Sequence, residues 1–170
     1  GAGLLLLLGR DLAPVMDLLD LAAVGTVADI CPVSGLNRWI LAMGLDRLAR
    51  SPNPGLKALL QVARGQPASA DETTLAFLLA PRLNAAGRIG DATRALALLL
   101  TEDPSEAAVL AGCLEEDNRN RQAIEGTVLA EALPLAERAW DPGRPGFLVV
   151  SGAGWHPGVV GIVAARLAER

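Results

Sequence analysis

The chain has 170 residues, enough for one domain or for two small ones. Hydrophobic residues make up 51% of it and aromatic residues only 3%, with no Tyr, so the core must be built from Leu, Val and Ala. The formal net charge of −4 and the pI near 5.0 exclude a broadly basic nucleic-acid surface, so any nucleic-acid contact would be a local arginine cluster.

Neither the cysteines nor the N-terminal leucines indicate an exported or membrane protein. Cys31 and Cys113 are far apart and have no CxxC spacing, which argues against a disulfide framework or a zinc site and favours a reducing, cytoplasmic setting. The run Leu4–Leu8 is too short to span a bilayer, and no basic segment precedes it as in a signal peptide. Because the chain lacks an initial Met and ends within an expected helix, we expect a piece of a longer protein.

The N-terminal part is apolar and continuous. We expect Gly1–Leu12 to be the core helix of an α/β unit. Periodicity does not separate a buried helix from a buried strand over residues 17–33. We favour a helix that is capped by Asp17 or Asp20 and stopped by Pro32.

Asp29 is a carboxylate at the end of this apolar run. Uncompensated burial of a charge is costly, so Asp29 should contact a metal ion, a basic group or backbone N–H donors. The alternative is that Asp29 lies in a helix C-terminal turn and caps the next loop.

Several short helices are expected to follow. Residues 37–50 form an amphipathic pattern whose apolar stripe is Ile40, Leu41, Leu45 and Leu48. Further helices are expected over residues 56–64, 71–79 with Asp71 as the cap, and 91–100.

The stretch APRLNAAGRIGD, residues 80–91, combines two arginines and an amide with small residues. If it is helical, Asn84 and Arg88 share one face at i, i+4, while Arg82 points elsewhere. Guanidinium groups and an amide suit recognition of phosphate oxygens. The alternative is a helix end whose arginines pair with local carboxylates such as Asp91.

Residues 101–139 are expected to form one long helix. Asp103 as N-cap, Pro104 at the first helical position and Glu106 at the third are typical of a helix start. We expect Pro134 to end or kink the helix.

The middle of this long helix, residues 115–122, is polar, whereas both of its ends are apolar. That pattern suits a bridge between two packed bodies. We interpret the polar run as a solvated face, with Arg119 and Arg121 at the border of a cleft as the alternative.

After a Pro- and Gly-rich linker, residues 147–151 (FLVVS) predict a short buried strand, which makes the expected fold class α/β. The turn 152–157 (GAGWHP) follows, with the chain's only histidine, His156, and a helix begins at Pro157 or Gly158. A strand, a Gly-rich turn and a helix N-terminus can bind an anion through backbone N–H groups and the helix dipole. A plain strand-to-helix connection is the alternative.

Four stretches together resemble the RecJ family, the single-strand-specific DNA exonucleases of the DHH phosphoesterase superfamily. They are residues 20–33, 79–92, 117–125 and 154–167, and they occur in the same order and spacing as in that family. The second and fourth are specific to RecJ-like proteins, whereas GTVAD in the first is shared more widely in the superfamily. The resemblance covers essentially the whole chain.

The resemblance implies an α/β enzyme with a long connecting helix. Residues 1–100 would be the C-terminal part of a DHH catalytic domain with following helices, 101–140 the connecting helix, and 141–170 the start of a DHH-associated domain. Family members use two Mn²⁺ or Mg²⁺ ions to hydrolyse single-stranded DNA from its 5′ end. The implied partners are single-stranded DNA and repair or recombination proteins, with no membrane, and the complete protein would be a monomer.

The resemblance also implies roles for individual residues. Asp29 matches a metal-ligand carboxylate and, with Arg88, a catalytic position. The residues that match phosphate- or strand-binding positions are Arg82, Asn84, Arg88, Gly154, His156 and Gly158. The Asp and His residues of the earlier DHH motifs are absent from this sequence, so we expect this segment alone to be inactive, because two ions need several carboxylates.

Two other functions stay open. One is a related phosphodiesterase acting on short oligonucleotides or cyclic dinucleotides, and the other is a non-catalytic scaffold that has lost its metal motifs. The long helix and the stretch 80–88 favour the exonuclease. Trp155 is the one aromatic residue near an expected contact, and we expect it to be packed rather than to stack on bases.

Overall fold

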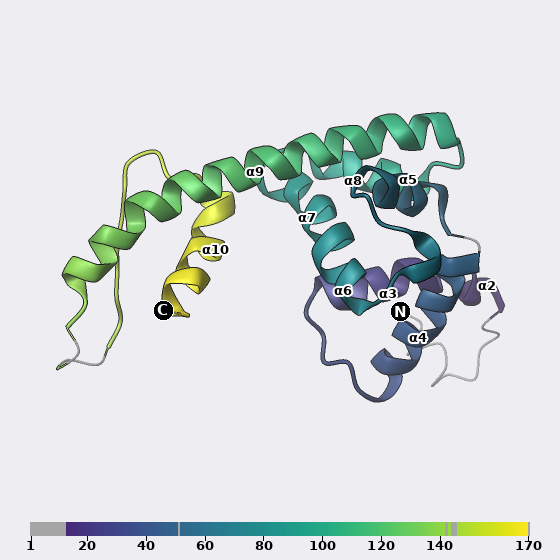
Figure 1. Cartoon of the computed structure of the whole chain (residues 1–170), viewed down its shortest axis with the longest axis horizontal. Coiled ribbons are helices and arrows are strands. Elements are labelled where there is room, and N and C mark those ends of the chain that lie inside the picture. Colours follow the sequence, from purple (N-terminus) through teal and green to yellow (C-terminus); the bar gives the residue numbers. More distant parts are fainter. Residues whose placement is uncertain (1–12, 51, 142, 144–145, 170) are drawn as a thin grey trace.

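The computed structural model describes residues 13–50, 52–141, 143 and 146–169, and all regular elements in them are helices. Figure 1 shows a long helix, α9, with a group of helices below one end and α10 below the other. The elements are α2 (Ala13–Met16), α3 (Leu19–Ala28), α4 (Gly35–Arg50), α5 (Pro54–Val62), the 3₁₀ turn η1 (Pro67–Ser69), α6 (Glu72–Thr74), the π-helix η2 (Leu75–Leu79), α7 (Ala80–Ile89), α8 (Ala92–Leu100), α9 (Pro104–Ala139) and α10 (Pro157–Ala168).

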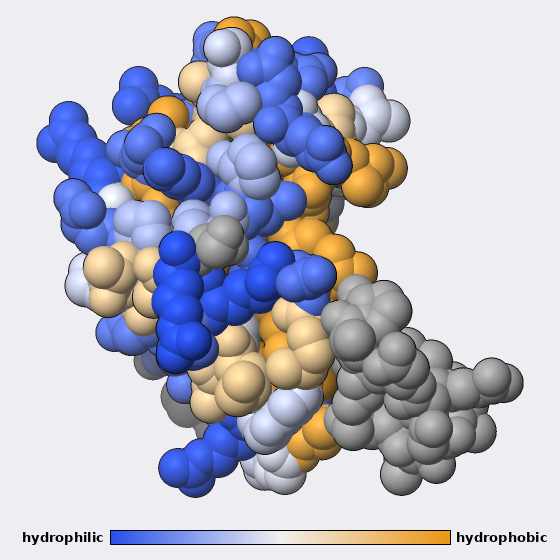
Figure 2. Space-filling model, turned by 90° about the vertical axis from the view of Figure 1, so that its right-hand side faces the viewer, coloured by the Kyte–Doolittle hydropathy of each residue, from blue (hydrophilic) through white to orange (hydrophobic). Residues whose placement is uncertain are grey.

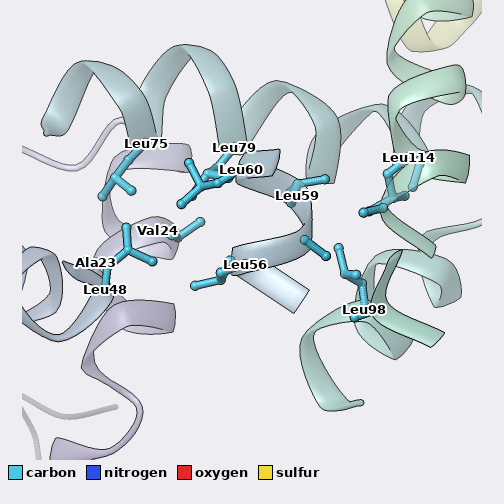
Figure 3. Packing of buried hydrophobic residues seen from close by; sticks show 14 of the residues in the cluster. Ala23, Val24, Leu48, Leu56, Leu59, Leu60, Leu75, Leu79, Leu98 and Leu114 are labelled. Atoms are coloured by element: carbon cyan, nitrogen blue, oxygen red, sulfur yellow. The ribbon is translucent and has the colours of Figure 1, made fainter. Parts of the chain in front are cut away.

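The elements from α2 to α8, with the first part of α9, form one helical body around a leucine-rich core. Figure 3 shows side chains from α3, α4, α5, η2, α8 and α9 pointing toward one another. The buried members of this cluster are Ala23, Val24, Leu41, Leu48, Leu56, Ala58, Leu59, Leu60, Leu75, Leu79, Ala86, Leu98, Ala107, Ala111 and Leu114. The expectation of a core without aromatic residues is confirmed for this cluster.

The apolar run 17–33 forms a helix, as predicted, but neither aspartate caps it. The N-cap of α3 is Leu18, without a side-chain cap. Asp20 is instead buried inside the helix, where it accepts a hydrogen bond from the backbone N–H of Asn53 at 3.0 Å. Asp17 pairs with Arg47 at 3.0 Å. The cap prediction for Asp20 failed because a loop distant in the sequence provides its hydrogen-bond donor, which the local sequence does not reveal.

Helix α9 continues for 36 residues, and Pro134 lies inside it. Of the two predicted effects of Pro134, an end or a kink, the end of the helix is therefore wrong. The predicted start is confirmed, because the side chain of Asp103 accepts from the N–H of Ser105 at 2.8 Å and Pro104 opens the helix. Beyond the helical body, α9 carries a second apolar cluster formed by Val128 and Ala132 with Val159 and Val163 of α10.

The predicted buried strand at residues 147–151 is wrong. These residues form no strand, and the side chains of Phe147 and Val149 have relative exposures of 104% and 84%. A strand needs a neighbour that pairs with its N–H and C=O groups, and β-branched residues alone do not provide one. The α/β prediction is therefore not confirmed by the described residues, and the helix expected over Gly1–Leu12 lies outside them.

Gly55 allows α5 to approach α8 closely. A Cβ at Gly55 would lie 2.0 Å from the backbone oxygen of Leu98, which no side-chain movement relieves. We expect Gly55→Ala to reduce the free energy of unfolding by about 1–3 kcal/mol, the usual scale of overpacking. The control is Gly112→Ala in α9, where a Cβ meets nothing within 4 Å and stability should rise by roughly 0.5–1 kcal/mol. Urea unfolding would measure both, and equal midpoints would contradict the prediction.

The surface mixes hydrophilic and hydrophobic regions. In Figure 2, hydrophobic side chains gather next to the grey atoms, while much of the remaining face is hydrophilic. Large exposed hydrophobic side chains of the described residues include Ile30, Phe77, Leu100 and Val109. We therefore keep the prediction that an isolated 170-residue chain is poorly soluble. None of the described helices combines the length and the apolar character needed to cross a membrane.

Candidate phosphate-binding site

Residues 80–89 of the stretch 80–91 form the helix α7. A π-helical turn precedes it, and Pro81 lies in its first turn. Ala85 and Ala86 are fully buried on its inner face. Asn84 and Arg88 are both exposed, which agrees with their i, i+4 spacing on one face.

Arg82 is held in an ion pair. Its side chain is 12% exposed, and its Nε donates to Glu115 of α9 at 2.6 Å. Its Nη1 also donates to the backbone oxygen of Leu78 at 2.8 Å. The pairing alternative is therefore correct for Arg82, although its partner is Glu115 rather than Asp91.

Asp91 does not pair with Arg82 but forms the N-cap of α8. Its carboxylate accepts a hydrogen bond from the backbone N–H of Thr93 at 2.9 Å. Hydrogen bonds from the side chain and backbone of Thr93 hold the pKa of Asp91 below its ordinary value of 3.8. The cap fixes the point where the chain leaves α7 and begins α8.

Arg88 and the start of α10 meet, although they are 70 residues apart in the sequence. The Nη1 of Arg88 donates to the backbone oxygen of Gly158 at 3.2 Å. A Cβ at Gly158 would lie 2.1 Å from the backbone oxygen of Arg88, so only glycine permits this contact. Figure 1 shows the upper end of α10 beside α7, close to α9. The arginine-containing stretch of α7 and the Gly-rich turn at the start of α10, which were predicted separately, therefore lie next to each other.

His156 caps α10. Its Nδ1 accepts from the N–H of Gly158 at 3.0 Å, and its backbone oxygen accepts from Val159 at 3.0 Å. These two backbone N–H groups are thus already paired, which corrects the expectation that they point at an anion. With Nδ1 as acceptor, neutral His156 carries its proton on Nε2 and keeps that donor for a ligand.

The turn before α10 also holds Trp155. Gly154 adopts a φ of +80°, which favours glycine. Trp155 packs against the second apolar cluster, and its Nε1 donates to Glu131 at 2.8 Å. The expectation that Trp155 is packed is confirmed.

Asp29 is the C-cap residue of α3 and is exposed. Its side chain makes one weak contact among the described residues, in which Cys31 Sγ donates to Oδ2 at 3.9 Å. The next residue, Ile30, has a φ of +54°, a strained value for a β-branched side chain. Within the described part of the chain, no three His, Cys, Asp or Glu side chains are grouped to hold a metal ion. These donors by themselves do not fit a two-ion centre.

A buried network that the sequence interpretation missed begins in the polar run of α9 and ends just after it. Asn118 and Glu125 are 3% and 2% exposed, and Arg121 lies between them with a side-chain exposure of 12%. The prediction of a solvated face for residues 115–122 is therefore wrong for Asn118 and Arg121, while Arg119 is exposed. The i, i+3 and i+7 spacing of Asn118, Arg121 and Glu125 places them on one helix face and could have indicated the network.

Comparisons with known proteins concern the chain and its fold as a whole. No family model matches the chain. RecJ of Bacillus subtilis is 45% identical over 154 residues, which cover 91% of this chain and 19% of that protein. Over most of its own length, the chain is thus similar to RecJ proteins. RecJ of Thermus thermophilus is 45% identical over 158 residues, covering 93% of this chain and 22% of that protein.

Crystal structures of RecJ have the same fold over this length. RecJ from Thermus thermophilus in complex with Mn²⁺ matches with a TM-score of 0.82 and 40% identity, over 99% of this chain and 24% of that one. An exonuclease RecJ bound to manganese matches with a TM-score of 0.80, again over 99% of this chain and 41% of the other. The chain thus spans well under half the length of the RecJ proteins it matches.

Proposed function

We propose that this chain is part of a RecJ-type exonuclease that hydrolyses single-stranded DNA from its 5′ end. The relatives are named single-stranded-DNA-specific exonucleases, and the matched structures hold Mn²⁺ or Mg²⁺. The observation that carries the proposal is the meeting of Arg88 with the capped start of α10. This contact brings hydrogen-bond donors that suit a phosphate group to one part of a chain that is acidic overall.

We assign a separate role to each residue of this candidate site. Arg88 and Asn84 present a guanidinium group and an amide on the exposed side of α7, and His156 adds the N–H on Nε2. Arg82 connects α7 to α9 through its ion pair with Glu115, so fewer of its guanidinium N–H groups are left to bind a ligand. Gly154 and Gly158 give the turn its conformation and its close approach to α7, so that the strand backbone can be gripped there.

Asp29 is our proposed metal ligand and the second catalytic residue besides Arg88. It is exposed at the end of α3, and α3 packs against α7. Bound Mn²⁺ or Mg²⁺ ions would supply water activation and charge stabilisation. The described residues do not make a complete centre, so Asp29 would be only one of the ligands of such a centre.

We further propose the domain organisation implied by the resemblance. Residues 1–100 end a DHH catalytic domain, 101–140 connect, and 141–170 begin a DHH-associated domain, with an α/β architecture in the complete protein. We also propose that the complete protein is a cytoplasmic monomer that works with repair or recombination proteins.

The test uses the full-length protein that contains this chain, with Mn²⁺. Substrates are a 5′-phosphorylated long single strand, the same strand in a duplex, and a cyclic dinucleotide. Degradation of the single strand from its 5′ end supports the proposal. Cleavage of the dinucleotide alone would favour a short-substrate phosphodiesterase, and binding without cleavage would favour a scaffold.

Asp29→Asn tests the metal assignment in the same assay. We expect hydrolysis to fall about 100-fold, a scale typical of losing one charge contact in the transition state. The matched control is Asp46→Asn on α4, whose carboxylate pairs with Arg50 on the surface, and it should retain full activity. Full activity of Asp29→Asn would contradict the metal-ligand role and leave Asp29 only a structural role at the end of α3.

A further inference from the structure

Glu125 is a buried carboxylate in the middle of α9 with arginines on two sides. Its Oε2 lies 2.5 Å from Nη1 of Arg121, one turn earlier in the same helix. Its Oε1 lies 2.8 Å from Nη2 of Arg166, which comes from α10. One carboxylate therefore joins the long helix to the helix that carries His156.

The network is built to fix the direction of the Glu125 side chain. Arg121 donates through Nη2 to Oδ1 of Asn118 at 2.9 Å, so its planar fork is held at both tips. Asn118 and Glu125 are almost fully buried, whereas Arg166 is half exposed. Because a buried charge is costly without partners, the Glu125 carboxylate favours the position of α10 that delivers Arg166.

The same helix α10 is attached at two further places. Gly158 contacts Arg88 at its start, and Val159 and Val163 pack against Val128 and Ala132 of α9. Apolar packing alone is non-directional, so it permits small rotations and shifts of α10. The ion pair between Arg166 and Glu125 adds an attraction between two specific groups, and the buried Oε1 of Glu125 has no hydrogen-bond partner among the described residues besides this ion pair.

We propose that Glu125 is a positioning residue for the strand-binding place. Through Arg166 it holds α10 in the orientation that keeps Gly158, which the His156 side chain caps, against Arg88, so that His156 and Arg88 act on one DNA backbone. This role rests on the proposed exonuclease function, but the geometry that it sets is measurable without any substrate.

The first experiment measures the distance between α7–α8 and α10 in the full-length protein. Spin labels at Thr93→Cys and Ala165→Cys, both exposed positions, report it by double electron–electron resonance after native cysteines are replaced. We expect one narrow distance distribution, which becomes broad in Glu125→Gln and in Arg166→Gln. The control is Glu116→Gln, which removes an exposed carboxylate from the same helix and should leave the distribution narrow.

Arg166→Gln is included because it changes a half-exposed side chain and leaves Arg121 paired, so it should fold even if Glu125→Gln does not. A narrow distribution in folded Arg166→Gln would overturn the proposal. So would a broad distribution with unchanged activity on a long strand.

The second experiment separates positioning from simple destabilisation. For a long single strand, we expect kcat/KM to fall about 100-fold in Arg166→Gln, the effect of an approximately 1 Å misplacement. Most of the loss should lie in KM, because Arg166 contacts Glu125 and none of the proposed strand-binding residues. If the wild type does not cut single-stranded DNA, the proposed function is wrong, while the distance measurement still supports or overturns the role of Glu125.

Discussion

Gly158→Ala is expected to reduce hydrolysis of a long single strand about 100-fold in the full-length protein. The added Cβ would lie 2.1 Å from the backbone oxygen and 2.8 Å from the carbonyl carbon of Arg88. Backbone atoms cannot rotate away, so α10 must shift relative to α7. A shift of about 1 Å at a substrate-positioning element is enough for a loss of this size.

Gly161→Ala is the matched control, since it lies in the same helix and makes the same chemical change. A Cβ at Gly161 meets nothing within 4 Å, so the position of α10 should be unchanged. Alanine also favours helix by roughly 0.8–1 kcal/mol, so the melting temperature should stay equal or rise. Equal steady-state rates for Gly158→Ala and Gly161→Ala would show that the close contact with Arg88 has no functional weight.

Arg88→Ala is expected to lower kcat/KM on a long single strand by about 100- to 1,000-fold, the range for losing one preorganised donor. Arg88→Lys should recover only part of this, because an ammonium keeps the charge but not the planar fork. The slope of log affinity against log salt concentration should also become shallower by about 0.7 for Arg88→Ala, as expected for one lost phosphate contact on a single strand.

Arg38→Ala provides the control for the loss of one positive charge. Arg38 is exposed on α4. Its removal should leave both the rate and the salt slope as in the wild type. If Arg88→Ala and Arg38→Ala behave alike, Arg88 serves only to pair with the backbone of Gly158.

Local sequence was enough for much of the helical framework. The N-caps Asp71 and Asp103 form as predicted, because capping depends only on residues within one turn. The apolar stripe of α4 faces the core, and Ala85 and Ala86 turn Asn84 and Arg88 outward, since helical periodicity alone decides a face. The resemblance to the RecJ family likewise rests on four short stretches of sequence and needs no tertiary contact.

Other features of the structure depend on contacts between residues that are distant in the sequence. Asp20 became a buried acceptor because Asn53 lies beside it, Arg82 found Glu115 on another helix, and the residues 147–151 stayed unpaired among the described part of the chain. The burial of Asn118 and Glu125 could not be read from the sequence, because burial depends on what packs against a helix and not on its composition. By itself, the sequence determined the helical periodicity and indicated candidate phosphate-binding residues. Only the tertiary structure brought Arg88 and Gly158, with the cap residue His156, together, because a contact across 70 residues depends on the packing of α7, α9 and α10.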